Sequence, residues 1–176
     1  VEREILSKTS NSDHNAFWLY YNITFGGAMI NFGLQQRKIA LFKGAYRYQQ
    51  NIFKDLGSFD IEVHEHPIIS GKVGKIRSKV FHNEFVDYAT WIKKHAEYAK
   101  WEAKVKNSSV KSVTLRQKVK YWLIGWKLFP LLYFVFVYIF KLGFLDGRPG
   151  LDYSILKSFY FYMINLELKV ISNNEK

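Results

Sequence analysis

Cysteine is absent from this chain of 176 residues, which excludes disulfides and thiolate metal sites. Its absence is compatible with a reducing compartment. Long apolar runs are missing as well. The longest, Leu128–Phe140, spans 13 residues, or roughly 20 Å of helix, whereas the hydrocarbon core of a bilayer is roughly 30 Å thick. The run is therefore short for a transmembrane span.

Acidic residues are few in comparison with basic ones. The chain has 15 Asp and Glu against 26 Lys and Arg, so its formal net charge is +11 at pH 7. A charge of this size favours an anionic partner, such as nucleic acid, anionic lipid or a phosphorylated substrate. The sequence has no helix-turn-helix or single-strand-binding signature and its C-terminal third is hydrophobic, so we expect no nucleic acid partner.

The segment Phe59–Pro67 carries the densest group of chemically useful side chains. Its apolar and polar residues alternate, which predicts a half-buried strand with Glu65 on the apolar side. Pro67 has no N–H to donate and ends the strand. Partial burial raises the pKa of a carboxylate and makes it a better base, so Glu65, between His64 and His66, is a candidate catalytic base. The alternative is an ion pair between Glu65 and a nearby Lys or Arg.

Short aromatic and apolar segments predict three further strands, at Phe17–Thr24, Arg37–Phe42 and Val80–His82. Gly26 and Gly27 follow the first of these strands, and they permit either a plain turn or a close approach of the backbone to a ligand. His82 ends the last strand. It is either structural or a metal ligand through its neutral imidazole.

A long amphipathic helix is predicted to follow Asn83, which is a suitable N-cap residue, and to continue to about Lys104. Its apolar residues recur at helical spacing, at Phe85, Ala89, Ile92, Ala96 and Ala99. The helix is expected to end before the polar segment 107–112.

Two aromatic stretches, Leu128–Phe140 and Leu151–Leu168, predict a helical hairpin around the connector Gly143–Gly150. Asp146 and Arg148 are expected to pair across this connector in a structural role. Lysines and arginines beside the hairpin suit anionic headgroups, and tyrosine and tryptophan suit the membrane interface. We therefore expect the hairpin to lie at an anionic membrane surface. The alternative is the helical core of a soluble protein.

Several motifs follow one another in a recognisable order along nearly the whole chain. They are Phe25-Gly26-Gly27, Ile39-Ala40-Leu41-Phe42, Val63-His64-Glu65-His66, Gly71-Lys72-Val73-Gly74, Phe81-His82, Tyr98 with Ala103, and Gly143-Phe144-Leu145-Asp146-Gly147-Arg148-Pro149-Gly150. In this order they resemble the C-terminal part of bacterial family 2 glycosyltransferases, especially the enzymes of lipopolysaccharide-core and exopolysaccharide assembly.

The resemblance implies an inverting sugar transfer in which Glu65 deprotonates the acceptor hydroxyl that attacks the anomeric carbon. It implies that His64 and His66 position the acceptor or the diphosphate. It also implies that Gly26 and Gly27 lie close to the nucleotide-sugar donor.

The family uses a divalent metal, Mg or Mn, and the resemblance makes His82 a candidate ligand. In the family, this metal is held mainly by an Asp-x-Asp motif, which is absent from this chain. The family's Arg-Leu-Phe is replaced here by Ala40-Leu41-Phe42. Arg37 is the candidate for the contact that the missing arginine makes.

The resemblance implies a GT-A fold, which is α/β and Rossmann-like, followed by a long amphipathic helix and a membrane-associated hairpin. We expect the acceptor-side half of the catalytic domain over residues 1–83, an amphipathic and basic helical region over 84–127, and the hairpin with a polar tail over 128–176. Because the chain begins with Val1 and the donor-binding half is missing, we expect a fragment that is inactive alone.

The leading hypothesis is thus a glycosyltransferase at the cytoplasmic face of the bacterial inner membrane. It would transfer a sugar from a nucleotide-sugar donor to a cell-surface glycan or a lipid-linked acceptor. The alternative comes from a different class: a noncatalytic membrane-associated binding module that docks on anionic lipid through its basic face.

Overall fold

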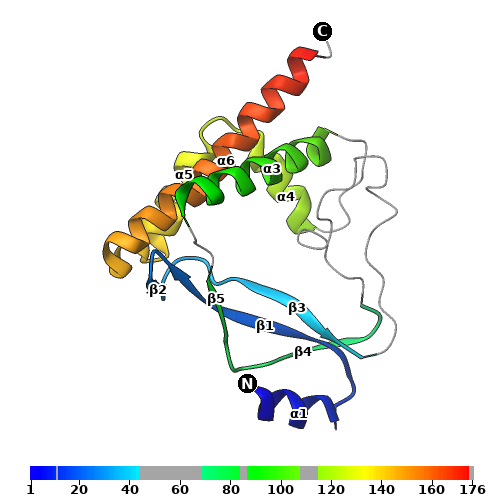
Figure 1. Ribbon diagram of the computed structural model, residues 1–176. Helices are drawn as coiled ribbons and strands as arrows, with labels where there is room; N and C mark the ends of the chain where they lie inside the picture. Colours follow the sequence, from blue (N-terminus) through cyan, green and yellow to red (C-terminus); the bar gives the residue numbers. More distant parts are fainter. Residues whose placement is uncertain (11, 44–68, 84–86, 108–114, 175–176) are drawn as a thin grey trace. The chain divides into compact units, whose positions relative to one another are not determined.

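The computed structural model of the protein describes residues 1–10, 12–43, 69–83, 87–107 and 115–174 (Figure 1). These residues form a mixed α/β structure with a long C-terminal helix. They divide into two compact units. The first contains Val1–Thr24 and Leu34–Glu84, and the second contains Phe25–Gly33 and Phe85–Lys176.

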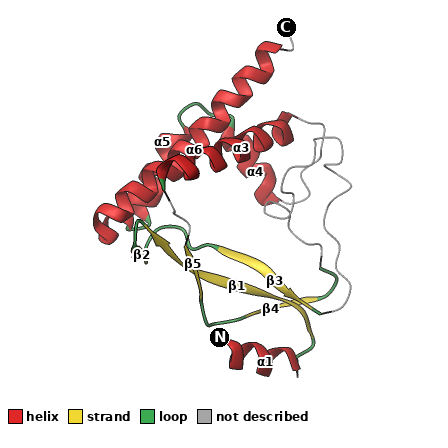
Figure 2. Ribbon diagram, viewed as in Figure 1, coloured by secondary structure: helices red, strands yellow, loops and turns green. Residues whose placement is uncertain are grey.

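The first unit is built around β1 (His14–Phe25), which has a partner strand on each side (Figure 2). On one side β3 (Arg37–Phe42) runs antiparallel to it, and on the other β4 (Lys72–Lys75) and β5 (Val80–Asn83) run parallel to it in succession. The strands predicted at Phe17–Thr24, Arg37–Phe42 and Val80–His82 are confirmed, and the segment 59–67 lies outside the described residues.

Alternation along β1 creates the core of the first unit. Phe17 and Leu19 point to one side of the strand, because successive side chains alternate between the two faces of a sheet, and both are buried together with Ile76. Helix α1 (Glu2–Ser10) packs Ile5 against this cluster. The helix thereby covers the apolar side of the sheet, as the pattern of β1 requires.

The second unit is helical, with α6 (Gly147–Asn174) as its longest element. Its 28 residues give roughly 42 Å of helix. Helix α6 contacts α3 (Tyr88–Asn107) and α5 (Phe129–Val135) most extensively, and it also touches α4 (Leu115–Ile124) (Figure 1). The unit also holds β2 (Ala28–Ile30), which follows the turn after β1.

Helix α3 differs in two respects from its prediction. Asn83 belongs to β5, and the N-cap is Asp87, whose Oδ1 accepts a hydrogen bond from the Thr90 N–H at 2.8 Å and whose pKa that bond lowers. Ala89 and Ile92 are exposed. Ala99 is buried as predicted, and the other buried residues of the helix are Trp91, His95, Tyr98, Trp101, Glu102, Ala103 and Val105.

The predicted hairpin of two aromatic helices is present, but its first arm is interrupted. Helix α5 ends at Val135 and continues as the π-helix η3 (Phe136–Phe140), after which a 3₁₀ turn, η4 (Gly143–Asp146), leads into α6. The hairpin arms pack through aromatic rings, since Phe129 and Tyr133 lie 5.0 and 4.5 Å from the ring of Phe161.

None of the described helices is by itself long and apolar enough to cross a membrane. The segments Lys118–Ile124 and Phe129–Phe140 are long and apolar enough for a membrane span only when they are taken together, and the chain bends by 112° between them.

Candidate functional site

The proposed base and its two neighbours, His64, Glu65 and His66, lie outside the described residues. The other four predicted site residues are described: Gly26, Gly27, Arg37 and His82. Their positions show which of them can act together.

The two glycines form the turn between β1 and β2. Their φ angles are 57° for Gly26 and 79° for Gly27, in the left-handed region that glycine adopts without steric cost. A Cβ added at either position would meet no atom within 4 Å. The glycines are therefore required by the backbone conformation, and the space above them is open.

Arg37 and His82 lie on opposite faces of the sheet. The guanidinium of Arg37 stacks over Trp18 at 4.5 Å and Nη1 donates to the Tyr20 hydroxyl at 3.5 Å, whereas the exposed ring of His82 lies 5.4 Å from that of Tyr21. Side chains of consecutive strand residues point to opposite faces, so the two predicted contacts do not converge. Within the described ranges, no three His, Cys, Asp or Glu side chains are grouped to hold a metal, so His82 has no such set of ligands there.

The connector before α6 does not contain the predicted Asp146–Arg148 pair. Arg148 Nε instead donates to both carboxylate oxygens of Asp152, at 2.9 and 3.0 Å, because residues four apart share a helix face once α6 begins at Gly147. The Asp146 carboxylate is bonded to a different segment, the one that follows β2. It accepts hydrogen bonds from the backbone N–H groups of Asn31 (3.1 Å) and Phe32 (2.9 Å).

Asp146 thus links two motifs that lie more than 100 residues apart. Two further contacts join the same segments: the Gly33 N–H donates to the Lys141 carbonyl at 2.9 Å, and the ring of Phe25 meets that of Tyr153 edge-on at 5.4 Å. The segment after the Gly-Gly turn is therefore held to the start of the C-terminal helix by a charged acceptor. Its sequence signal is the acidic residue inside the Gly-Phe-Leu-Asp-Gly element.

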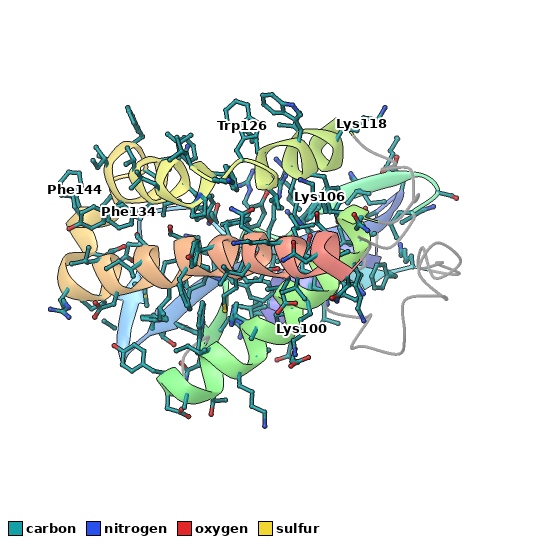
Figure 3. All side chains as sticks on the ribbon, turned by 90° about the horizontal axis from the view of Figure 1, so that it is seen from above. Lys100, Lys106, Lys118, Trp126, Phe134 and Phe144 are labelled. Carbon is teal, nitrogen blue, oxygen red and sulfur yellow. The ribbon has the colours of Figure 1, made fainter. Side chains whose placement is uncertain are left out.

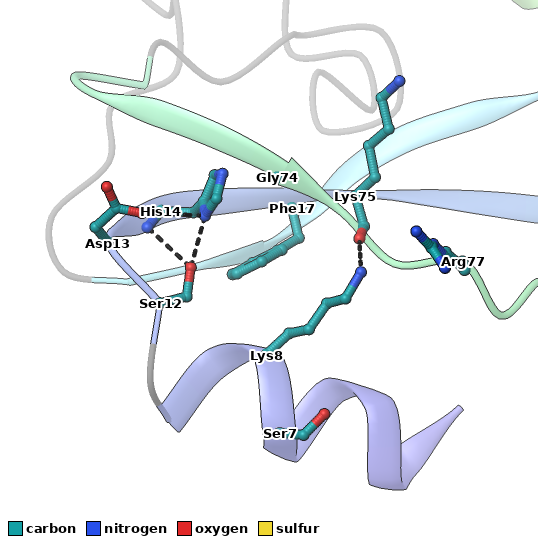
Figure 4. A pocket seen from close by; sticks show the side chains of 9 residues that line it. All are labelled: Ser7, Lys8, Ser12, Asp13, His14, Phe17, Gly74, Lys75 and Arg77. Carbon is teal, nitrogen blue, oxygen red and sulfur yellow. Dashed lines mark hydrogen bonds and ion pairs between the residues drawn. The ribbon is translucent and has the colours of Figure 1, made fainter.

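The first unit contains an open pocket of about 570 Å³ between α1, the start of β1 and the end of β4 (Figure 4). It includes a serine, an aspartate and a histidine in direct succession. Ser12 Oγ lies 2.6 Å and Asp13 Oδ1 3.4 Å from the same nitrogen of His14, Nδ1. A catalytic relay needs the serine and the carboxylate on different ring nitrogens. This trio is therefore a local turn and not a nucleophile with its base.

Two lysines at or beside this pocket, Lys8 and Lys72, form ion pairs within the first unit. Lys8 Nζ lies 3.2 Å from the Glu4 carboxylate and donates to the Lys75 carbonyl at 2.7 Å. The side chain of Lys75 extends away from Lys8 in Figure 4. Lys72 pairs with Asp13, and that pairing lowers the pKa of the aspartate. Contacts within the fold therefore occupy Lys8 and Lys72, and Lys75 and Arg77 are the other cations at the pocket.

Glu4 binds the backbone of the connection between β4 and β5. Its two carboxylate oxygens accept the backbone N–H groups of Arg77 and Ser78 at 2.7 and 2.8 Å, which lowers the pKa of Glu4 from 4.5 to about 2. A depressed carboxyl pKa contributes stability that is present above pH 4.5 and is lost as the pH falls towards 2.

We therefore expect Glu4→Gln to reduce the loss of folding stability that acid pH causes. Urea unfolding of the whole chain at pH 7, 4.5 and 2.5 should show a smaller decrease in midpoint for the variant than for the wild type. Glu2→Gln, an exposed position in the same helix, is the matched control and should retain the wild-type pH dependence. An unchanged pH dependence in Glu4→Gln would contradict the role of these two hydrogen bonds.

A buried ionic group in the second unit escaped prediction. Glu102 is almost fully buried, and its Oε1 lies 2.6 Å from Lys120 Nζ on α4. Its second oxygen, Oε2, is buried without a hydrogen-bond partner among the described residues. Burial, together with the nearby Glu102 carboxylate, raises the pKa of Tyr121 and of Tyr160. The signal that could have revealed Glu102 is its place in the i, i+4, i+7, i+11 series that starts at Trp91.

Comparison of the chain with protein-family models, curated proteins and solved structures found no match.

Proposed function

We propose that this chain is the acceptor-side and membrane-attachment portion of a glycosyltransferase. It acts at the cytoplasmic face of the bacterial inner membrane, where the enzyme transfers a sugar from a nucleotide-sugar to a glycan or lipid-linked acceptor with inversion. Glu65 is the proposed base, and His64 and His66 position the acceptor or diphosphate. The GT-A fold is part of the proposal, and the mixed α/β structure is compatible with it.

The observation that carries the proposal is the junction at Asp146. The Gly26-Gly27 turn and the Gly143–Gly150 element are two of the motifs on which the resemblance rests, and the segment after the turn is hydrogen-bonded to Asp146. A donor-side loop must be held in one geometry for efficient transfer, because orientation of the reactants supplies much of a catalyst's effect. A charged acceptor on two backbone N–H groups provides such an anchor.

The divalent metal of the family is not accounted for by the residues described. His82 is exposed on β5, and no group of three His, Cys, Asp or Glu side chains within the described ranges could hold a metal. We therefore assign no chemical step to the metal in this chain.

Glu65→Gln in the complete enzyme tests the assignment. Gln keeps the size of the side chain but cannot accept the proton, so we expect transfer to fall by roughly a hundredfold or more. Incorporation of radiolabelled sugar from a panel of nucleotide-sugars into the glycolipid fraction measures it. Glu62→Gln, three residues upstream, is the control and should keep near-normal activity. Equal activity of Glu65→Gln and the wild type would remove Glu65 as the base.

The second candidate, a noncatalytic membrane-binding module, is favoured by the large exposed apolar side chains of the second unit. It predicts no detectable sugar transfer by the wild type and unchanged lipid binding in Glu65→Gln. The same pair of assays therefore separates the two functions.

A further inference from the structure

One surface of the second unit exposes large apolar side chains to solvent over several consecutive elements. It runs from α4 through α5 and η3, and Phe140, at the end of η3, is 72% exposed. Its other main members are Trp122, Trp126, Leu128, Leu131 and Leu132. We call this surface the apolar face. Contiguous exposed apolar surface of this kind marks a binding site more often than it marks ordinary solvent-facing structure.

Charge around the apolar face has a single sign. Between Ala103 and Leu145 the sequence contains eight Lys and Arg and no Asp or Glu. Lys118 and Lys127 are exposed, and Lys141 Nζ lies 5.5 Å from the ring of Phe136. Exposed apolar side chains on a segment whose own charges are all positive complement a surface that is apolar below a layer of negative charge.

Two tryptophans add a second indication. Trp122 and Trp126 are both exposed, and their rings meet edge-on at 4.4 Å. Figure 3 shows Trp126 between α4 and α5. Tryptophan has an apolar body with one polar N–H, and it concentrates at the boundary between headgroups and acyl chains. Tryptophan is also common at protein interfaces, so the positive charge of the same segment is the feature that favours an anionic bilayer.

We propose that the apolar face docks on the surface of a phospholipid bilayer that contains anionic headgroups. Trp122, Trp126 and the exposed leucines enter the boundary between headgroups and acyl chains, and Lys118, Lys127 and Lys141 contact lipid phosphates. The contact surface is therefore the segment from α4 to η3, whereas the sequence predicted contact through the hairpin of Leu128–Phe140 and Leu151–Leu168. This inference rests on the membrane-attachment part of the proposed function and names the surface that makes the contact, and lipid binding is measured without donor or acceptor.

Cosedimentation of the whole chain with vesicles tests the apolar contribution. Vesicles of phosphatidylcholine with about 30% phosphatidylglycerol should bind the wild type, and Leu131→Glu should weaken binding roughly tenfold or more. Leu6→Glu on α1 is the matched control, since Leu131 and Leu6 are 61% and 59% exposed and the charge change is identical. Both positions are exposed, and far-UV circular dichroism verifies folding.

Lysine variants test the electrostatic contribution separately. Lys118→Gln/Lys127→Gln should weaken binding to the anionic vesicles roughly tenfold or more, whereas the control Lys79→Gln/Lys93→Gln should bind as the wild type does. Added salt should weaken wild-type binding. Absence of vesicle binding by the wild type would overturn the proposal, as would equal losses in variants and controls. Either result can occur with sugar transfer intact, which keeps this proposal distinct from the transferase.

Discussion

Gly150→Ala is expected to destabilise the second unit by about 3 kcal/mol or more, because a Cβ at this position collides with backbone. The added carbon would overlap the Gly143 carbonyl oxygen and lie 2.8 Å from Asp146 Cβ. Neither neighbour is the free end of a flexible side chain, so η4 would have to move away from α6. The same movement would displace Asp146 from the N–H groups of Asn31 and Phe32.

Thermal unfolding followed by circular dichroism measures this effect. For a chain of this size, 1 kcal/mol corresponds to roughly 2–4 °C, so the midpoint should fall by roughly 6 °C or more. Gly125→Ala is the matched control. Its Cβ would meet the end of the flexible Lys106 side chain, which can move, so the change should stay below about 1 kcal/mol. Similar midpoints for the two variants would show that η4 and α6 are not closely packed at Gly150.

Lys120→Met is expected to destabilise the chain by about 2–4 kcal/mol, because it leaves a buried carboxylate without its cation. The side chain of Glu102 is 4% exposed and that of Lys120 is 41% exposed. The loss should lie below that for a fully buried pair, since the lysine is partly hydrated. Urea unfolding at pH 7 gives the free energy of unfolding directly.

Two further variants separate charge from packing at this pair. Lys100→Met removes the exposed partner of Glu97, 3.0 Å away on the same helix, and should leave the urea midpoint nearly unchanged. In Glu102→Leu/Lys120→Met both charges are gone, and most of the lost stability should return. A double variant that is as unstable as Lys120→Met alone would show that the lysine acts through packing and not through its charge.

The strands of the first unit could be predicted because their sequence pattern and their burial have the same origin. Phe17, Leu19 and Ile23 lie on one side of β1 by the two-residue period of a strand, and they are buried for that reason. The same use of periodicity predicted the buried face of helix α3 only in part. Of its predicted stripe Ala99 is buried, but Ala89 and Ile92 are exposed, whereas the larger side chains of Trp91 and Tyr98, which bury more surface, are on the buried side.

The site could be predicted only in part, because much of it depends on contacts between distant segments. The turn at Gly26 and Gly27 follows from local backbone preference and was predicted. The partners of Asp146 are 114 and 115 residues away in the sequence, and no local sequence pattern predicts a hydrogen bond over that distance. Arg148 lies two residues after Asp146, yet its partner is Asp152, because the helix begins earlier than the glycines and proline of the connector suggested.

Leu142 adopts a backbone conformation that costs free energy. It is the residue before η4, and its φ of 60° places a branched side chain in a conformation that costs roughly 1–2 kcal/mol more than it would cost glycine. The side chain is 44% exposed, so burial within the chain recovers little of that cost. Glycine would adopt this conformation at less cost. The chain therefore holds one more exposed apolar side chain, just past the end of the apolar face, at the expense of its own stability.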